Sequence, residues 1–294
     1  MVGTRKGFHI FVNVMMILLV IVCLFPFVIM IMSSFTAEET LIANGFSAFP
    51  KKFGIEAYAY LFKDPMMIIR SYGVTILVTV IGTVLGLIIS TFLAYGLSIK
   101  KLPFRRIIAF YLFFTMLFNG GTVPSYMIWT QIFHIKNTLG ALIFPRLLVF
   151  AFYVIVMRTY FQTNIPEEIK EAAKIDGAGE FKILKDVVLP MAVPMIVTIG
   201  LMIGISYWND WINGLYYITD SKLYSVQQIL NRMLQDARFL TTNTSGVENL
   251  ASGYVPNNGL KMAIAAVGAI PIMVLLPSFQ KYYVKGLTLG SVKG

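Results

Sequence analysis

Long stretches without a formal charge dominate this chain and restrict what it can fold into. With histidine taken as neutral, uncharged stretches cover residues 9–35, 71–99, 107–135, 187–209 and 262–280. A helix needs about 20 apolar residues to cross the hydrocarbon core of a bilayer. Only 13% of the residues are charged, against about 25% in an average soluble domain. The sequence therefore predicts an integral membrane protein.

A sixth candidate span covers residues 139–161, with Arg146 near its outer end and Arg158 near its inner end. Both side chains are long enough to reach the interfaces from within a helix. The first stretch is too long for the core of a signal peptide, and no Ala-x-Ala site follows it. We expect an all-α integral membrane fold with six transmembrane helices.

Lys and Arg residues indicate the orientation of these helices. If the N-terminus is cytoplasmic, the inside segments carry more Lys and Arg than the outside segments. The bias is clearest between the second and third spans, where four basic residues occur without an acid: Lys100, Lys101, Arg105 and Arg106. We expect both termini inside. The net charge of +10 lies in gaps between the spans, which fits membrane topology better than a nucleic-acid partner.

The composition argues against a catalytic or metal centre in this chain. His9 and His134 are the only histidines and lie far apart in sequence, and the single cysteine, Cys23, lies inside an apolar stretch. These residues supply neither a Cys-based metal site nor a nucleophile with a base. The chain also has no Gly-x4-Gly-Lys-Ser/Thr phosphate loop. We expect no bound cofactor and no ATP hydrolysis by this chain alone.

The inside segment over residues 162–186 has the most informative sequence. Asn164 is a plausible N-cap, and Pro166 can occupy the first turn of a helix that Gly177 ends, either in the left-handed conformation or as a turn. A second amphipathic piece over 180–188 leads to Leu189-Pro190. Two such helices would offer a rigid knob to a partner. The alternative is an interfacial helix that has no partner.

This segment resembles the Glu-Ala-Ala loop of binding-protein-dependent ABC importer permeases. Val187 stands where isoleucine is usual, and Asp-Gly-Ala is the form common in sugar permeases. The resemblance implies contact with a separate ATPase for the residues Glu171, Ala172, Ala173, Asp176, Gly177, Leu189 and Pro190.

Three further segments support the carbohydrate branch of this family. The end of the chain, 280–294, resembles the tail of the smaller permease subunit of maltose-type importers, and the resemblance implies ATPase contacts for Lys285, Gly286 and Gly290. Residues 207–215 resemble the end of the fifth helix of sugar permeases. Residues 118–126 look like the branch that handles complex oligosaccharides.

The resemblance implies a type I ABC importer permease in the bacterial cytoplasmic membrane. Its expected partners are a second homologous permease subunit, two ATP-binding subunits that hold ATP and Mg²⁺, and an extracellular solute-binding protein or lipoprotein. It also implies three parts: an N-terminal helix with an outside segment (1–70), a transmembrane core (71–282) that carries the loop 162–186, and a cytoplasmic tail (283–294).

A sugar pathway needs aromatic faces together with amides and hydroxyls. Residues of this kind at membrane depth are Asn119, Tyr126, Tyr207, Trp208, Asn209 and Asp210. An aromatic belt at the outer interface would have the same composition. Asp210 could equally pair with a basic residue of the sister subunit.

Other functions remain open at this point. A secondary transporter driven by protons or sodium would be expected to carry ionisable residues at mid-membrane, and the uncharged spans offer almost none. A permease of the same architecture could also import amino acids, metals or phosphate. Sugar-stimulated ATP hydrolysis by the purified complex would discriminate these possibilities.

Overall fold

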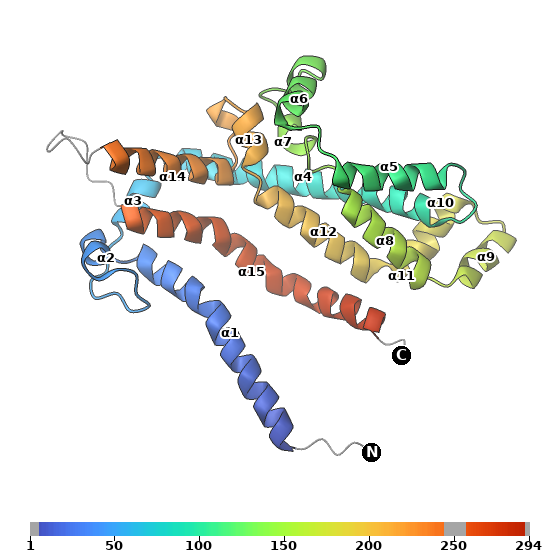
Figure 1. Cartoon of the computed structure of the whole chain (residues 1–294), viewed down its shortest axis with the longest axis horizontal. Helices are drawn as coiled ribbons and strands as arrows, with labels where there is room; N and C mark the ends of the chain where they lie inside the picture. The colour runs from blue at the N-terminus through green and yellow to red at the C-terminus, as the bar shows by residue number, and fades with distance from the viewer. Residues whose placement is uncertain (1–5, 244–256, 292–294) are drawn as a thin grey trace. The chain divides into compact units, whose positions relative to one another are not determined.

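The structure, a computed structural model, describes residues 6–243 and 257–291 and is built from helices (Figure 1). Within these residues, strand pairing is limited to one isolated antiparallel bridge between Thr36 and Phe53. Helices suit a bilayer because they satisfy their own backbone hydrogen bonds. The chain divides into two compact units, Met1–Ile68 with Leu230–Pro271 and Ile69–Ile229 with Ile272–Gly294.

The first unit contains α1 (Lys6–Ser34), α2 (Glu38–Asn44), α3 (Glu56–Leu61) and the first half of α15 (Asn257–Ser291). α1 is apolar over most of its length, and its side chains from Phe8 to Phe25 are exposed, except that of Val12, which is half-buried. A small core joins α2, α3 and α15 through Leu41, Ala57, Leu61, Leu260 and Ala263, all buried.

Glu38 holds the beginning of α15 within this unit. Its carboxylate is 5% exposed. Oε1 accepts the backbone N–H of Asn258 at 2.8 Å, and Oε2 accepts that of Gly259 at 2.7 Å. The first N–H groups of a helix have no partner inside the helix, and the positive end of the helix dipole favours an anion. Glu38 therefore caps α15 from α2.

The second unit contains most of α4 (Pro65–Ser98) and the elements that follow it. These are α5 (Arg105–Leu117), α6 (Thr122–Met127), the π-helix η1 (Ile128–Ile132), α7 (Gly140–Ile143), α8 (Ala151–Thr163), α9 (Glu167–Ile175), α10 (Glu180–Ile183), the π-helix η2 (Leu184–Val188), α11 (Leu189–Met191), α12 (Val193–Trp208), α13 (Ile212–Tyr217) and the 3₁₀ turn η3 (Ser221–Leu223). The first turn of α14 (Val226–Asn243) and the second half of α15 also belong to this unit, whereas residues 230–243 of α14 belong to the first unit.

Three helices are long and apolar enough to cross a membrane among the described residues: Gly7–Ser34, Pro65–Ser98 and Asn258–Leu275. They correspond to the predicted spans 9–35, 71–99 and 262–280. Two bent pairs raise the number to as many as 5 if each is one broken span. These pairs are Arg105–Leu117 with Thr122–Ile132, bent by 115°, and Glu180–Met191 with Val193–Trp208, bent by 85°.

The sixth candidate span, 139–161, is not one continuous helix, because the structure divides it into α7 and α8. The backbone between them leaves the helical path at Arg146, whose φ is +65°. Carbonyl groups freed by this break need other donors. The Tyr207 hydroxyl donates to the Ile143 carbonyl at 2.8 Å, and the Asn213 amide donates to that of Pro145 at 2.9 Å. Side chains at and after the end of α12 therefore supply donors to the carbonyl groups that the break leaves without helical partners.

Candidate functional site

The loop over 162–186 begins with a helix whose start is fixed by a proline. Pro166 takes an extended conformation (φ −55°, ψ 137°) at the N-cap position of α9, and no side chain caps the helix. Glu167 and Glu168 follow in the first turn, where the helix dipole favours acids. The prediction that Asn164 is the N-cap is wrong. Asn164 is the C-cap of α8, because a residue before Ile165-Pro166 is too far from the first free N–H groups of α9.

Gly177 ends α9 in the left-handed conformation, which is one of the two alternatives that the sequence left open. Its φ is +80°. The Gly177 N–H donates to the Lys174 carbonyl at 3.0 Å, and the Ala178 N–H donates to the Ala173 carbonyl at 2.9 Å. These two bonds form a Schellman motif, which satisfies the last carbonyls of a helix while reversing the chain. The turn between α9 and α10 is therefore defined by its own hydrogen bonds.

Glu180, the first residue of α10, joins the loop to α4. Its Oε1 pairs with the Lys174 ammonium at 2.6 Å, and its Oε2 accepts a hydrogen bond from the Tyr95 hydroxyl at 2.6 Å. Tyr95 is 6% exposed and lies near the end of α4. One carboxylate thus connects α9, α10 and a long membrane helix. Neither Tyr95 nor Glu180 could be recognised as a contact from the sequence, because 85 residues separate them.

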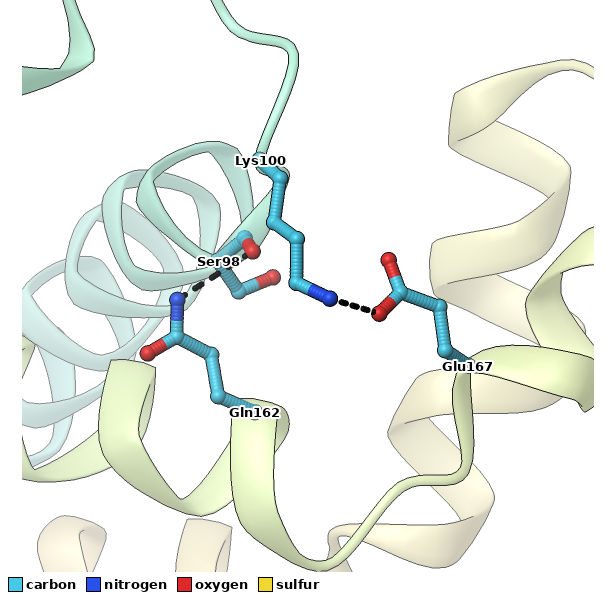
Figure 2. A network of polar contacts seen from close by, with 4 residues as sticks. All are labelled: Ser98, Lys100, Gln162 and Glu167. Carbon is cyan, nitrogen blue, oxygen red and sulfur yellow. Dashed lines mark hydrogen bonds and ion pairs between the residues drawn. The ribbon is translucent and has the colours of Figure 1, made fainter.

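A second attachment joins the beginning of α9 to the loop after α4. Figure 2 shows the Lys100 side chain reaching Glu167, with Nζ and Oε2 2.5 Å apart. Beside it, the Gln162 amide donates to the Ser98 carbonyl at 3.3 Å. The hydrogen bond from Lys100 holds the pKa of the Glu167 carboxyl below its ordinary value, and it raises the pKa of Lys100. Both side chains are largely exposed, so salt screens this pair.

The outward side of α9 has no partner within the described chain. None of its residues is buried, and Glu171 and Ala172 are exposed, while Ala173 is half-buried. Ile175 is 86% exposed. Phe181 on α10 is 66% exposed, but its ring stacks on Phe92 of α4, with centroids 6.3 Å apart. Ile175 therefore joins the predicted residues as a candidate for partner contact.

The other side of the loop is anchored in the unit. Ile183, Leu184 and Val188 are buried on α10 and η2. The chain then bends by 85° between Glu180–Met191 and Val193–Trp208. Leu189 and Pro190 lie just before this bend, in α11. Proline has no N–H to donate and disfavours a continuous helix, which fits a bend here.

The predicted pathway residues separate into two groups in the structure. Asn119 lies at the break between α5 and α6, where its side chain accepts the Gly121 N–H at 2.9 Å and so supports the turn, and Tyr126 lies within α6. The Tyr126 ring stacks on Tyr217 of α13, with centroids 5.8 Å apart. The other group, Tyr207, Trp208, Asn209 and Asp210, lies at the end of α12. Tyr126 thus connects its group to α13, the helix that follows Asp210.

Each member of the second group has a structural role here. Tyr207 and Trp208 are buried, and the Asn209 amide donates to the Ile205 carbonyl at 3.0 Å. Asp210 Oδ1 accepts the N–H groups of Ile212 and Asn213, which begin α13. Contact of these four residues with a substrate stays a prediction.

The predicted tail contacts cannot be placed, because they fall where side chains are not described. The backbone of α15 is helical to Ser291, but Lys285, Gly286 and Gly290 lie where side chains are not described, and Gly294 lies outside the described residues. Within the described part of the chain, no three His, Cys, Asp or Glu side chains gather in a way that could hold a metal ion.

Comparison with known proteins gives consistent results. Residues 86–289 match the family model of the binding-protein-dependent transport system inner membrane component. The polygalacturonan/rhamnogalacturonan transport system permease protein YtcP of Bacillus subtilis is 34% identical over 281 residues, which cover 95% of this chain and 96% of that protein. The trehalose/maltose transport system permease protein MalG of Thermococcus litoralis is 28% identical over 281 residues, which cover 95% of this chain and 94% of that protein.

One solved structure is similar over nearly the whole chain. It is the crystal structure of a bacterial ABC transporter involved in the import of the acidic polysaccharide alginate. The TM-score is 0.76 at 27% identity, with 96% of this chain and 99% of that chain covered.

Proposed function

Because the chain belongs to the family of binding-protein-dependent transport system inner membrane components, we propose that it is the membrane permease subunit of an ATP-driven importer that takes up a sugar or oligosaccharide. The similar proteins named above are sugar transport permeases and a polysaccharide importer. As a member of this family the chain resides in the bacterial cytoplasmic membrane. A carbohydrate cargo fits the names of these relatives better than an amino acid, a metal or phosphate.

The observation that carries this proposal is the loop around α9. Its Schellman turn fixes α9 against α10, and Glu180 ties both helices to α4 through Tyr95. Its outer side presents Glu171 and Ile175 to a partner. The chain has no phosphate loop of its own, so the energy for transport would come from a separate ATPase. A rigid, exposed pair of helices can move as one body and so transmit a conformational change from that partner.

The proposed mechanism follows from the attachment of α9 and α10 to α4. Two ATP-binding subunits hold ATP and Mg²⁺, and one of them receives α9. Their closure on ATP moves the loop as a rigid body, and the bend at Leu189-Pro190 carries the movement into α12. The pathway between this chain and a second homologous permease then opens outward, where a solute-binding protein delivers the sugar. Hydrolysis resets the cycle. Tail contacts by Lys285, Gly286 and Gly290 would add a second link to the ATPase.

The topology belongs to the same proposal. Six spans, with both termini inside, place the loop 162–186 in the cytoplasm beside the basic residues after α4. The parts 1–70, 71–282 and 283–294 then act as an anchor with an outside segment, a transport core and a cytoplasmic tail.

The test uses the complete complex in proteoliposomes, with ATP hydrolysis and sugar uptake measured together. We expect Glu171→Lys and Gly177→Val to abolish uptake and to remove stimulation of ATP hydrolysis by sugar-loaded binding protein. Both variants should still insert in the membrane. Glu39→Lys makes the same charge change on the exposed surface of α2 and should transport normally.

Normal uptake by both loop variants would overturn the assignment of the loop. Uptake that survives without ATP but stops when the proton or sodium gradient is collapsed would instead identify an ion-coupled secondary transporter. ATP-dependent import of another solute class, without response to sugars, would leave the architecture but overturn the cargo.

A further inference from the structure

A cavity lined by positive side chains lies between the loop after α4, the beginning of α5 and Arg158 of α8. Its volume is about 560 Å³. Four of the eight residues that line it are basic, and none is acidic: Lys100, Arg105, Arg106 and Arg158, with Leu102, Phe104, Ile107 and Ala109. Like charges around one space repel each other unless an anion occupies it.

The hydrogen bonding of these side chains leaves donors free. Lys100 pairs with Glu167, and Arg105 uses its Nε to donate to the Leu97 carbonyl at 2.9 Å. Neither Arg106 nor Arg158 forms an ion pair within the described part of the chain. The Arg158 Nε is buried and has no hydrogen-bond partner there. A buried donor without a partner costs free energy, so the arrangement favours a ligand with acceptor oxygens.

The residues around the mouth of the cavity indicate what kind of anion fits. Phe104 is 74% exposed and Ile107 is 64% exposed, and both lie at the beginning of α5, a helix with no acid in its first turn. Guanidinium groups bind phosphate oxygens in pairs. An apolar rim beside a phosphate-binding pocket fits a molecule that has a phosphate at one end and hydrocarbon at the other.

We propose that this cavity binds the phosphate group of an anionic phospholipid of the inner leaflet, with Arg106 and Arg158 as the principal donors. The acyl chains lie along Phe104 and Ile107. Lys100, which lines the cavity, also pairs with Glu167 at the beginning of α9. A bound lipid therefore stabilises the contact between the loop after α4 and α9.

The experiment measures lipid binding to the purified, delipidated complex by native mass spectrometry and by thermal unfolding. Phosphatidylglycerol and phosphatidylcholine are the two lipid probes, and inorganic phosphate is the soluble one. We expect saturable binding and stabilisation with phosphatidylglycerol only. Removing one charged donor should weaken this binding roughly tenfold.

The test variants are Arg106→Gln, which changes an exposed side chain, and Arg158→Gln. Lys101→Gln is the matched control, because it removes the same charge from the same loop but does not line the cavity. We expect weaker phosphatidylglycerol binding in the Arg106 variant and unchanged binding in the control. Equal binding by Arg106→Gln and Lys101→Gln would overturn the site. Equal stabilisation by inorganic phosphate or phosphatidylcholine would overturn the lipid as its ligand.

Discussion

Gly177 has a φ of +80°, and no atom lies within 4 Å of the position that a Cβ would take. A substitution here therefore acts through backbone strain and not through a clash. The left-handed conformation costs about 1 kcal/mol or more for most residues, and Asn tolerates it better. The importance of this backbone conformation can be tested by comparing residues that differ in how readily they adopt it.

We expect Gly177→Val to reduce sugar-stimulated ATP hydrolysis strongly and Gly177→Asn to retain most of it. The reason is that a β-branched residue opens the Schellman turn, while Asn keeps it. The measurement is ATP hydrolysis by the reconstituted complex with and without sugar-loaded binding protein. Equal activities for the two variants would show that the turn's conformation is unimportant.

Glu38 gives a second prediction at this scale, in the other unit. We expect Glu38→Ala to destabilise the protein by about 2 kcal/mol, since hydrogen bonds to a charged group contribute about 1.5–3 kcal/mol and the N–H groups of Asn258 and Gly259 lose their acceptor. Thermal unfolding of the detergent-solubilised protein measures this. Glu39→Ala removes a neighbouring, exposed acid and should change little; a similar loss in both variants would contradict the capping role.

At the scale of elements, Glu180 and Tyr95 connect α10 with α4. We expect Tyr95→Phe and Glu180→Gln each to lower ATP-coupled uptake several-fold, with a double variant no worse than Glu180→Gln, because both changes break one contact. Tyr111→Phe, at an exposed tyrosine of α5, is the control. Additive losses in the double variant would mean that the two residues act independently.

The pair of Lys100 and Glu167 should contribute less, because water and salt surround it. The pKa of Glu167 is lowered in the folded protein, so the stabilising effect of the pair is complete above the ordinary pKa of a glutamate. It is lost only as the pH falls through the lowered value. We therefore expect Glu167→Gln to leave the pH profile of ATP-coupled uptake unchanged between about pH 6 and pH 8. A difference within that range would contradict the assignment.

The sequence predicted some elements well and others poorly, for physical reasons. The helices over 9–35 and 71–99 follow from apolar length alone, and the end of α9 follows from Gly177. The break at Arg146 could not be predicted, because it depends on hydrogen bonds from Tyr207 and Asn213, over 60 residues away. The attachment through Tyr95 was missed for the same reason. Asn164 was misassigned because a cap depends on where the backbone leaves the preceding helix.

At the scale of the whole molecule, the function depends on subunits that this chain does not contain. Loss of the ATPase subunits should abolish uptake while the permease remains in the membrane. The exposed side of α9, with Ile175 86% exposed, is the place where that dependence should be visible. A chemical probe at this position reports both the side of the membrane and the presence of the partner.

The most direct test is maleimide labelling of Ile175→Cys, in a Cys23→Ser background, with a reagent that does not cross membranes. We predict labelling in inside-out vesicles stripped of the ATPase, protection when the ATPase is restored, and no labelling in right-side-out vesicles. Labelling from outside, or no protection by the ATPase, would contradict the proposal that this loop binds the ATPase.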